Sequence, residues 1–266
     1  MSWESIEMVI TKKEDILKNM IIIEGATFMR GSSESGDEEP VMEVTLSTFA
    51  IDITPVTNQE YKAFIDSGGY ENPEFWTEKG WKYKTSLDLK HPNFWLDSHW
   101  NKDDSPVTGV SFWEALAYAK FAGKTLPTEA QWEFACKGFD QRKYPWGNEP
   151  PTEEYAYYAP DCIAVEGVGL RSSPSVYAHP KNKSYFGCLQ MAGNMGEWCL
   201  DNASPNYSWD KTGYNPIYIT SEEDYHILRG GSGLHGDVYL RCTSRDYYPP
   251  TMRDDISGFR CVVNDL

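Results

Sequence analysis

Helix start signals in this 266-residue chain occur at three short stretches, and residues 1–20 are expected to form a short charged helix or an arm. Each of the three stretches begins with a capping box, in which a Ser or Thr side chain accepts a hydrogen bond from the amide three residues later and the Glu or Gln there returns one. The boxes, each with the glycine that ends its stretch, are Thr57 to Glu60 with Gly68, Ser111 to Glu114 with Gly123, and Thr128 to Gln131 with Gly138. Because no helical pattern longer than these occurs, most of the chain must fold as short strands and loops.

The remaining segments support that interpretation. Residues 21–23 and 41–53 have the apolar or alternating patterns of strands, and the last forty residues contain only short apolar pieces. Residues 69–106 and 139–226 are predicted to be loops, rich in the chain's 10 Trp and 17 Tyr. We find no repeat and no linker, so we expect a charged N-terminal arm over 1–20 and one domain over 21–266. The expected fold class is α+β and loop-rich, stabilised by buried aromatic side chains.

The charge balance restricts the partners. With 24 basic and 40 acidic residues the net charge is −16, which disfavours binding to nucleic acid and to anionic membrane surfaces. The same charge is compatible with binding of a cation such as calcium. No run of about 18 apolar residues predicts a transmembrane segment. The first twenty residues lack the apolar centre of a signal peptide. We therefore expect either a cytoplasmic protein or one whose export signal is absent from this sequence.

Six short motifs in a fixed order resemble the formylglycine-generating enzyme (sulfatase-modifying factor) family. They are TNQEY at 57–61, GKTLPTEAQWEF at 123–134, YPWGN at 144–148, GNMGEW at 193–198, RGGS at 229–232 and GFRC at 258–261. The resemblance covers residues 20–264. It implies that family's elaborated C-type-lectin-like fold, with a small twisted sheet, flanking helices and extensive loops.

The same resemblance implies that family catalysis is absent here. The oxidase members hold copper with two cysteines between the GGS motif and the next Arg-Cys pair, where this chain reads GLHGDVY over 233–239 and has no thiolate for Cu(I). His235 alone would be a poor copper ligand. Other members use iron on a His-x-x-x-His-x-Glu set, a spacing that the five histidines here do not show. We therefore expect no copper, no formylglycine-generating activity and no enzyme.

The region 229–261 also resembles the variable proteins of diversity-generating retroelements, such as the Treponema variable protein. Tyrosines, acids and small residues are interspersed there among scaffold residues, a composition typical of recognition surfaces. None of the interspersed residues is Lys, Glu, Gln, Met or Trp, the types that adenine mutagenesis of an AAC codon cannot produce. The expected variable surface consists of Gly233, Leu234, His235, Gly236, Asp237, Val238, Tyr239, Asp246, Tyr247, Tyr248, Thr251, Asp254 and Asp255. The scaffold arginines of this region (Arg229, Arg241, Arg245, Arg253 and Arg260) are expected mostly to pair with acids or stack on aromatic rings.

This resemblance predicts a non-catalytic binding protein whose diversified C-terminal surface recognises an unknown protein or glycan. It implies that the protein is displayed at the cell surface, lipid-anchored or secreted. A cytoplasmic location is the alternative. The alternatives are a divergent metal oxidase of the formylglycine-generating type, a non-catalytic member that docks another enzyme, and an ordinary polar loop.

The family resemblance also implies a calcium site and a disulfide. Asn194 and Glu197 of the GNMGEW motif are the expected calcium ligands; the alternative is that Glu197 pairs with an arginine while Trp198 packs in the core. Cys136 and Cys242 match a disulfide of secreted relatives, with two buried thiols as the alternative.

Overall fold

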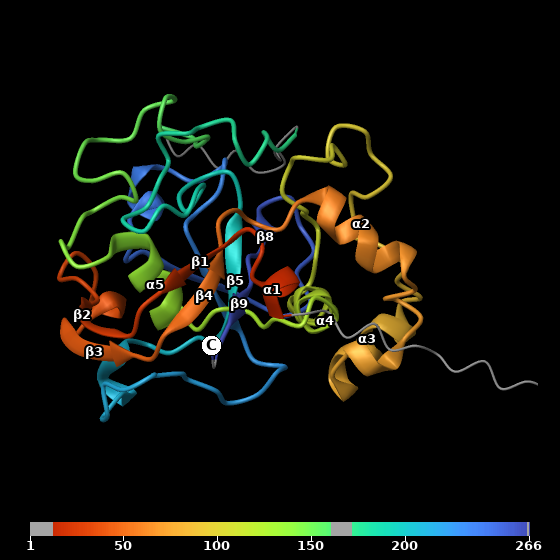
Figure 1. Cartoon of the computed structure of the whole chain (residues 1–266), viewed down its shortest axis with the longest axis horizontal. Coiled ribbons are helices and arrows are strands. Elements are labelled where there is room, and N and C mark those ends of the chain that lie inside the picture. Colours follow the sequence, from red (N-terminus) through yellow and green to blue (C-terminus); the bar gives the residue numbers. More distant parts are fainter. Residues whose placement is uncertain (1–12, 161–171, 265) are drawn as a thin grey trace, which may run out of the picture.

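The strands form three small sheets in the computed structural model, which describes residues 13–160, 172–264 and 266 (Figure 1). Their orders are β1-β4-β9, β2-β3 and β7-β6-β5-β8, with β5 and β8 parallel and the other named pairs antiparallel. The strands are β1 Met20–Ile23, β2 Ala26–Arg30, β3 Met42–Leu46, β4 Phe49–Asp52, β5 Gly196–Asn202, β6 His226–Arg229, β7 Arg245–Tyr248, β8 Ser257–Gly258 and β9 Val262–Val263.

Short helices flank these strands. They are α1 Lys13–Ile16, α2 Asn58–Asp66, α3 Glu78–Ser86, α4 Phe112–Phe121 and α5 Glu129–Lys137, with 3-10 turns at Gly36–Glu38, Pro73–Phe75, Tyr207–Trp209 and Asp237–Leu240. In the view of Figure 1, α2, α3 and α4 lie on one side of β1, β4 and β5, and α5 lies on the other side, toward β2 and β3. All three predicted capping boxes are confirmed, since both hydrogen bonds of each box are present. Within the described residues no helix is long and apolar enough to cross a membrane.

The sequence predictions are wrong in three places. The segment 41–53 forms two strands, β3 and β4, separated at Ser47-Thr48. Helix α3 and strand β5 lie in segments that were expected to be loops. Helix α3 has its N-cap at Thr77, but Gly80 at the third helical position cannot complete a capping box, so the box signature is missing. Strand β5 is buried on both faces, so its sequence does not alternate.

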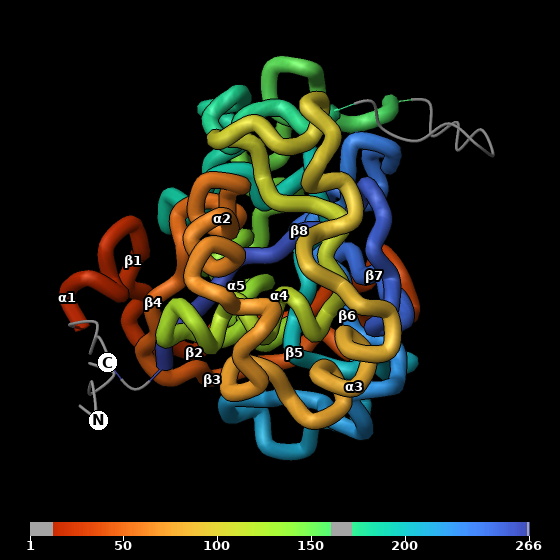
Figure 2. Tube along the Cα trace, turned by 90° about the vertical axis from the view of Figure 1, so that its right-hand side faces the viewer, coloured from red at the N-terminus to blue at the C-terminus, as the bar shows by residue number. Residues whose placement is uncertain are grey.

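Aromatic side chains fill the core, as predicted. Around α4, Tyr61 stacks on Tyr118 with ring centroids 5.3 Å apart, and Phe259 meets both rings edge-on. A second cluster surrounds Trp132 and Phe134 of α5. Figure 2 shows how much of the trace between these clusters is loop. Buried rings therefore connect segments that share little regular structure.

Helix α5 is buried along its whole length although it carries charges. Glu129, Glu133 and Lys137 are four residues apart and share one face. Glu133 pairs with Lys137 at 2.8 Å and with Arg229 of β6 at 2.5 Å, and Glu129 pairs with Arg245 of β7 at 2.6 Å. Burial alone would raise the pKa of Glu133, but Lys137 and Arg229 hold this pKa at about 2. Ion pairs thus fix α5 against the two strands that carry the candidate site.

Candidate functional site

A tight turn after β6 positions the candidate site. Gly230 and Gly231 have φ angles of 91° and 64°, which favour glycine. A Cβ on Gly231 would lie 2.9 Å from the carbonyl oxygen of Tyr239, so the loop could not close with a larger residue there. The turn brings residues 232–240 back beside strand β7.

Five side chains converge where this loop meets β7; we call them the His235 cluster: Ser232, His235, Tyr239, Asp246 and Tyr248. Nδ1 of His235 accepts the backbone N–H of Ser232 at 3.0 Å and lies 2.9 Å from the Ser232 hydroxyl. Nε2 of His235 lies 3.8 Å from Oδ2 of Asp246, and the same oxygen accepts the Tyr248 hydroxyl at 3.0 Å. The rings of His235 and Tyr239 are 4.6 Å apart. The cluster therefore combines an imidazole, a carboxylate and two phenols.

The protonation states follow from this geometry. Because Nδ1 of His235 accepts a backbone N–H, the ring proton belongs on Nε2, which faces Asp246. Burial lowers the pKa of His235, and Asp246 only partly opposes that shift. Burial and then Asp246 raise the pKa of Tyr248, so its phenol stays protonated. At neutral pH the cluster therefore holds a neutral His235 imidazole and a protonated Tyr248 phenol beside Asp246.

Strand alternation separates the two consecutive tyrosines of β7. Asp246 and Tyr248 point toward His235, whereas Tyr247 is on the other face and meets Tyr225 edge-on, with ring centroids 6.0 Å apart. Tyr247 lines a different, shallow hollow with Ala203, Tyr218, Thr220, Asp224 and Tyr225. Of the proposed surface residues on β7, Tyr247 therefore lies on a different face from Asp246 and Tyr248.

The other proposed surface residues differ in exposure. Gly233 and Gly236 are buried. Leu234, Asp254 and Asp255 are half-buried, and the Oδ1 atom of Asp254 accepts the backbone N–H of Ile256. Those that are open to solvent are Asp237, Val238 and Thr251.

The two expected calcium ligands have protein partners. Glu197 accepts from Arg260 at 2.6 and 2.8 Å and from the Trp132 indole at 2.7 Å. The Asn194 amide accepts the Ser173 hydroxyl at 2.7 Å. Trp198 is buried. These contacts match the alternative that the sequence left open for Glu197 and Trp198, and calcium stays a prediction.

The cysteines and arginines cross-link distant segments. Cys136 at the end of α5 forms a disulfide with Cys242. The expected pairing of the scaffold arginines is confirmed: Arg229 pairs with Glu133, Arg241 with Glu38, Arg245 with Glu129, Arg253 with Glu114 and Arg260 with Glu197. Three of these arginines thereby tie β6, β7 and the loop between them to α5 and Glu38.

The free thiols of the described residues do not fit the copper site of the family's oxidases. Cys188, Cys199 and Cys261 are buried, and burial raises the pKa of each thiol, which disfavours the thiolate that Cu(I) requires. No group of three or more His, Cys, Asp or Glu side chains in the described ranges could hold another ion. We therefore derive no step through a metal from these side chains.

Sequence reasoning assigned Ser232 to the scaffold and missed its contact with His235. It also missed Tyr225, the partner of Tyr247, because residues 139–226 were treated as a loop. The RGGS motif was the available signal for Ser232, since its glycine turn is what allows residue 232 to meet residue 235.

Comparison with known proteins establishes the relationship. The family model for the sulfatase-modifying factor enzyme 1-like domain matches residues 7–265. Hercynine oxygenase of Mycobacterium tuberculosis is 36% identical over 245 residues, covering 84% of this chain and 54% of the oxygenase. The formylglycine-generating enzyme of Thermomonospora curvata is 30% identical over 294 residues, covering 95% of this chain and 96% of the enzyme. Variable protein 1 of Treponema denticola has a TM-score of 0.60 at 19% identity, over 91% of this chain and 94% of that one, which shows the shared fold alone.

These matches correct one prediction and confirm another. The expectation that the chain is not an enzyme is wrong, because relatives that match most of its length include enzymes named as an oxygenase and a formylglycine-generating enzyme. The chain spans about half the length of the hercynine oxygenases that it matches. The family resemblance and the fold class are confirmed by the family match and by the shared fold. The chain belongs to the family of sulfatase-modifying factor enzyme 1-like domains.

Proposed function

We propose that this chain belongs to an enzyme that acts on a small cationic derivative of an amino acid, as hercynine oxygenase acts on hercynine, and that the His235 cluster binds the substrate's positive end. The observation that carries the proposal is the convergence of the Asp246 carboxylate with two phenol rings and a neutral imidazole. The identity to hercynine oxygenase supports the choice of substrate class.

The cluster is chemically suited to a cation. Asp246 supplies a negative charge and is 28% exposed, so a ligand can reach it. Aromatic faces attract quaternary and protonated ammonium groups, and Tyr239 and Tyr248 provide two such rings. The neutral form of His235 adds no repulsion. Hercynine, the trimethylammonium betaine of histidine, combines a fixed cation with a carboxylate and an imidazole.

The residues of the cluster have separable roles in this proposal. Asp246 attracts and orients the cation, while Nε2 of His235 and the hydroxyl of Tyr248 hold protons beside it. The Ser232 backbone N–H fixes the tautomer of His235. Each role concerns binding, orientation or the position of a proton.

Calorimetric titration of the whole chain with hercynine tests the proposal. We expect binding by the native chain and a loss of about tenfold or more in affinity for Asp246→Asn, because one charge facing the cation is removed. Asp66→Asn is the matched control, since Asp66 lies on α2 and is exposed beside Lys62. The proposal fails if about 10 mM hercynine, well above a weak Kd of ~1 mM, gives no binding. It also fails if Asp246→Asn binds hercynine as tightly as the native chain.

A diversified recognition surface is the second candidate function, and it is compatible with catalysis. The exposure of Asp237, Val238, Tyr247 and Thr251 supports it. The buried positions of Gly233 and Gly236 count against them as recognition residues. DNA sequencing downstream of the gene tests this candidate: it requires a near-copy of the segment encoding 229–261 that differs only at adenines, and the lack of such a copy would refute it.

A further inference from the structure

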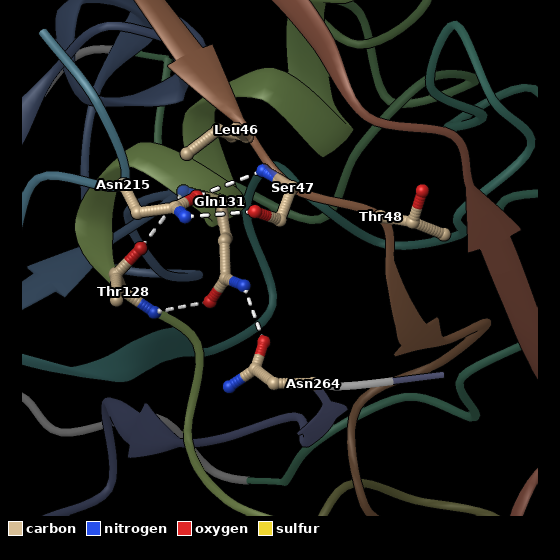
Figure 3. A pocket seen from close by; sticks show the side chains of 7 residues that line it. All are labelled: Leu46, Ser47, Thr48, Thr128, Gln131, Asn215 and Asn264. Atoms are coloured by element: carbon tan, nitrogen blue, oxygen red, sulfur yellow. Dashed lines mark hydrogen bonds between the residues drawn. The ribbon is translucent and has the colours of Figure 1, made fainter.

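We infer that a pocket built from residues outside the His235 cluster binds a neutral sugar. The pocket has a volume of about 210 Å³. It lies where the turn between β3 and β4 meets the N-terminus of α5 and the loop around residue 215 (Figure 3). The lining residues are Leu46, Ser47, Thr48, Thr128, Gln131, Asn215 and Asn264. This volume suits one small ring rather than a drug-sized ligand.

The lining has an unusual charge character for this protein. The chain carries a net charge of −16, yet none of the seven lining side chains is charged, and six of them end in a hydroxyl or an amide. Hydroxyls and amides can both donate and accept hydrogen bonds, which matches the hydroxyl groups of a sugar. Because no lining side chain can pair with an ion, the pocket favours an uncharged ligand.

Hydrogen bonds fix most of these side chains in place before any ligand arrives. The capping box of α5 holds Thr128 and Gln131, since Oε1 of Gln131 accepts the Thr128 N–H at 3.0 Å. Nε2 of Gln131 donates to Oδ1 of Asn264 at 2.7 Å. Across the pocket, the Asn215 amide exchanges two 2.8 Å bonds with Ser47 (Figure 3). A preorganised polar wall of this kind lowers the entropy cost of binding.

The fixed side chains keep unused hydrogen-bonding capacity. The Thr128 hydroxyl accepts the Gln131 N–H but has no acceptor for its own hydrogen among the described residues. The amide nitrogen of Asn264 likewise has no partner within that part of the chain, and Gln131 retains a second N–H. Three donor groups from two separate segments therefore remain for a ligand with several oxygen atoms.

Tyr214 places an aromatic ring beside the pocket. Its side chain is 59% exposed, and its hydroxyl lies 3.0 Å from the Ser47 hydroxyl. The backbone around Tyr214 is held against β3 by two hydrogen bonds. The Thr45 N–H donates to the Gly213 carbonyl oxygen at 2.6 Å, and the Asn215 N–H donates to the Thr45 carbonyl oxygen at 2.9 Å. An exposed ring in a fixed position can pack against the apolar C–H face of a sugar, while the amides contact its hydroxyls.

Saturation-transfer NMR on the whole chain tests the inference, with glucose, galactose, mannose, N-acetylglucosamine and the acidic sugar sialic acid as probes. We expect transfer to at least one neutral sugar and none to sialic acid. We also expect Asn264→Ala and Tyr214→Ala to weaken the neutral-sugar signal at least severalfold. Tyr177→Ala is the control, because Tyr177 is a similarly exposed tyrosine that lines a different pocket, whereas the Tyr214 hydroxyl lies beside Ser47 of this one.

Three results would overturn the inference: no transfer to any neutral sugar, transfer to sialic acid as strong as to the neutral sugars, or an unchanged signal in both Asn264→Ala and Tyr214→Ala when each is folded. Circular dichroism of each variant establishes folding. The outcome is independent of the hercynine titration, because the two sites share no residue.

Discussion

Removal of the disulfide between Cys136 and Cys242 should lower the free energy of unfolding by more than the truncation of two buried free thiols does. The two cysteines are 106 positions apart in the sequence. In the chain-entropy account, closing a loop of that length lowers the entropy of the unfolded chain by about 16 cal/mol/K, or about 5 kcal/mol at 25 °C. That value is a large part of the stability of an ordinary domain.

The assay compares urea unfolding of the native chain with Cys136→Ala/Cys242→Ala. Cys199→Ala is the matched control, because Cys199 is equally buried but carries a free thiol. Truncation of a buried thiol costs on the order of 1 kcal/mol through lost packing, so the control should lose about that much. The double variant should lose about 5 kcal/mol beyond twice the control's loss.

Two results would refute this reasoning. The first is a double variant that loses no more than twice the loss of the control. The second comes from a thiol count on unreduced, denatured protein: the chain has six cysteines and one disulfide uses two of them, so at most four should react. Six reactive thiols would show that the disulfide does not form.

Three further predictions follow from the buried and clustered charges. Glu133→Gln removes the carboxylate that pairs with Lys137 and Arg229, and leaving those cations unpaired should cost about 3–5 kcal/mol in urea unfolding. Burial lowers the pKa of His226 from 6.5 to about 4, so between these pH values the unfolded chain binds a proton that the folded chain does not bind. The free energy of unfolding should therefore fall by up to about 3 kcal/mol as the pH falls from 6.5 to 4. In His226→Gln this part of the pH dependence of unfolding should be absent. Burial lowers the pKa of His235, so this imidazole should become protonated only at a pH below the usual range for histidine, and its positive charge should then weaken the binding of hercynine at Asp246. Calorimetry at several pH values should show this loss of affinity in the native chain. The same loss of affinity in His235→Asn would contradict the prediction.

Local sequence signals predicted the elements that depend on neighbouring residues. The capping boxes at Thr57, Ser111 and Thr128 form because their partners are three residues away. Helix α3 was missed because Gly80 takes the place of the acidic partner. Strand β5 was missed because it is buried on both faces and therefore does not alternate. Elements that depend on contacts between residues far apart in the sequence therefore show a weaker local sequence signal.

The candidate site shows the same limit. Pairing of the scaffold arginines with acids was predicted, but the partners were not, since Arg241 and Glu38 are 203 positions apart. The division between Asp246 and Tyr248 on one face and Tyr247 on the other follows from the two-residue period of a strand. It became visible only when β7 was located. The convergence of His235 on Asp246 depends on the glycine turn as well as on β7.

The histidine resonances of the ¹⁵N-labelled chain, measured with and without hercynine, test the central account most directly. His235→Asn assigns the His235 signals among those of the five histidines. At about pH 7 we predict a neutral ring with its proton on Nε2, and we predict that these resonances shift when hercynine is added. A ring protonated on Nδ1, or His235 resonances that do not move at saturating hercynine, would contradict the account.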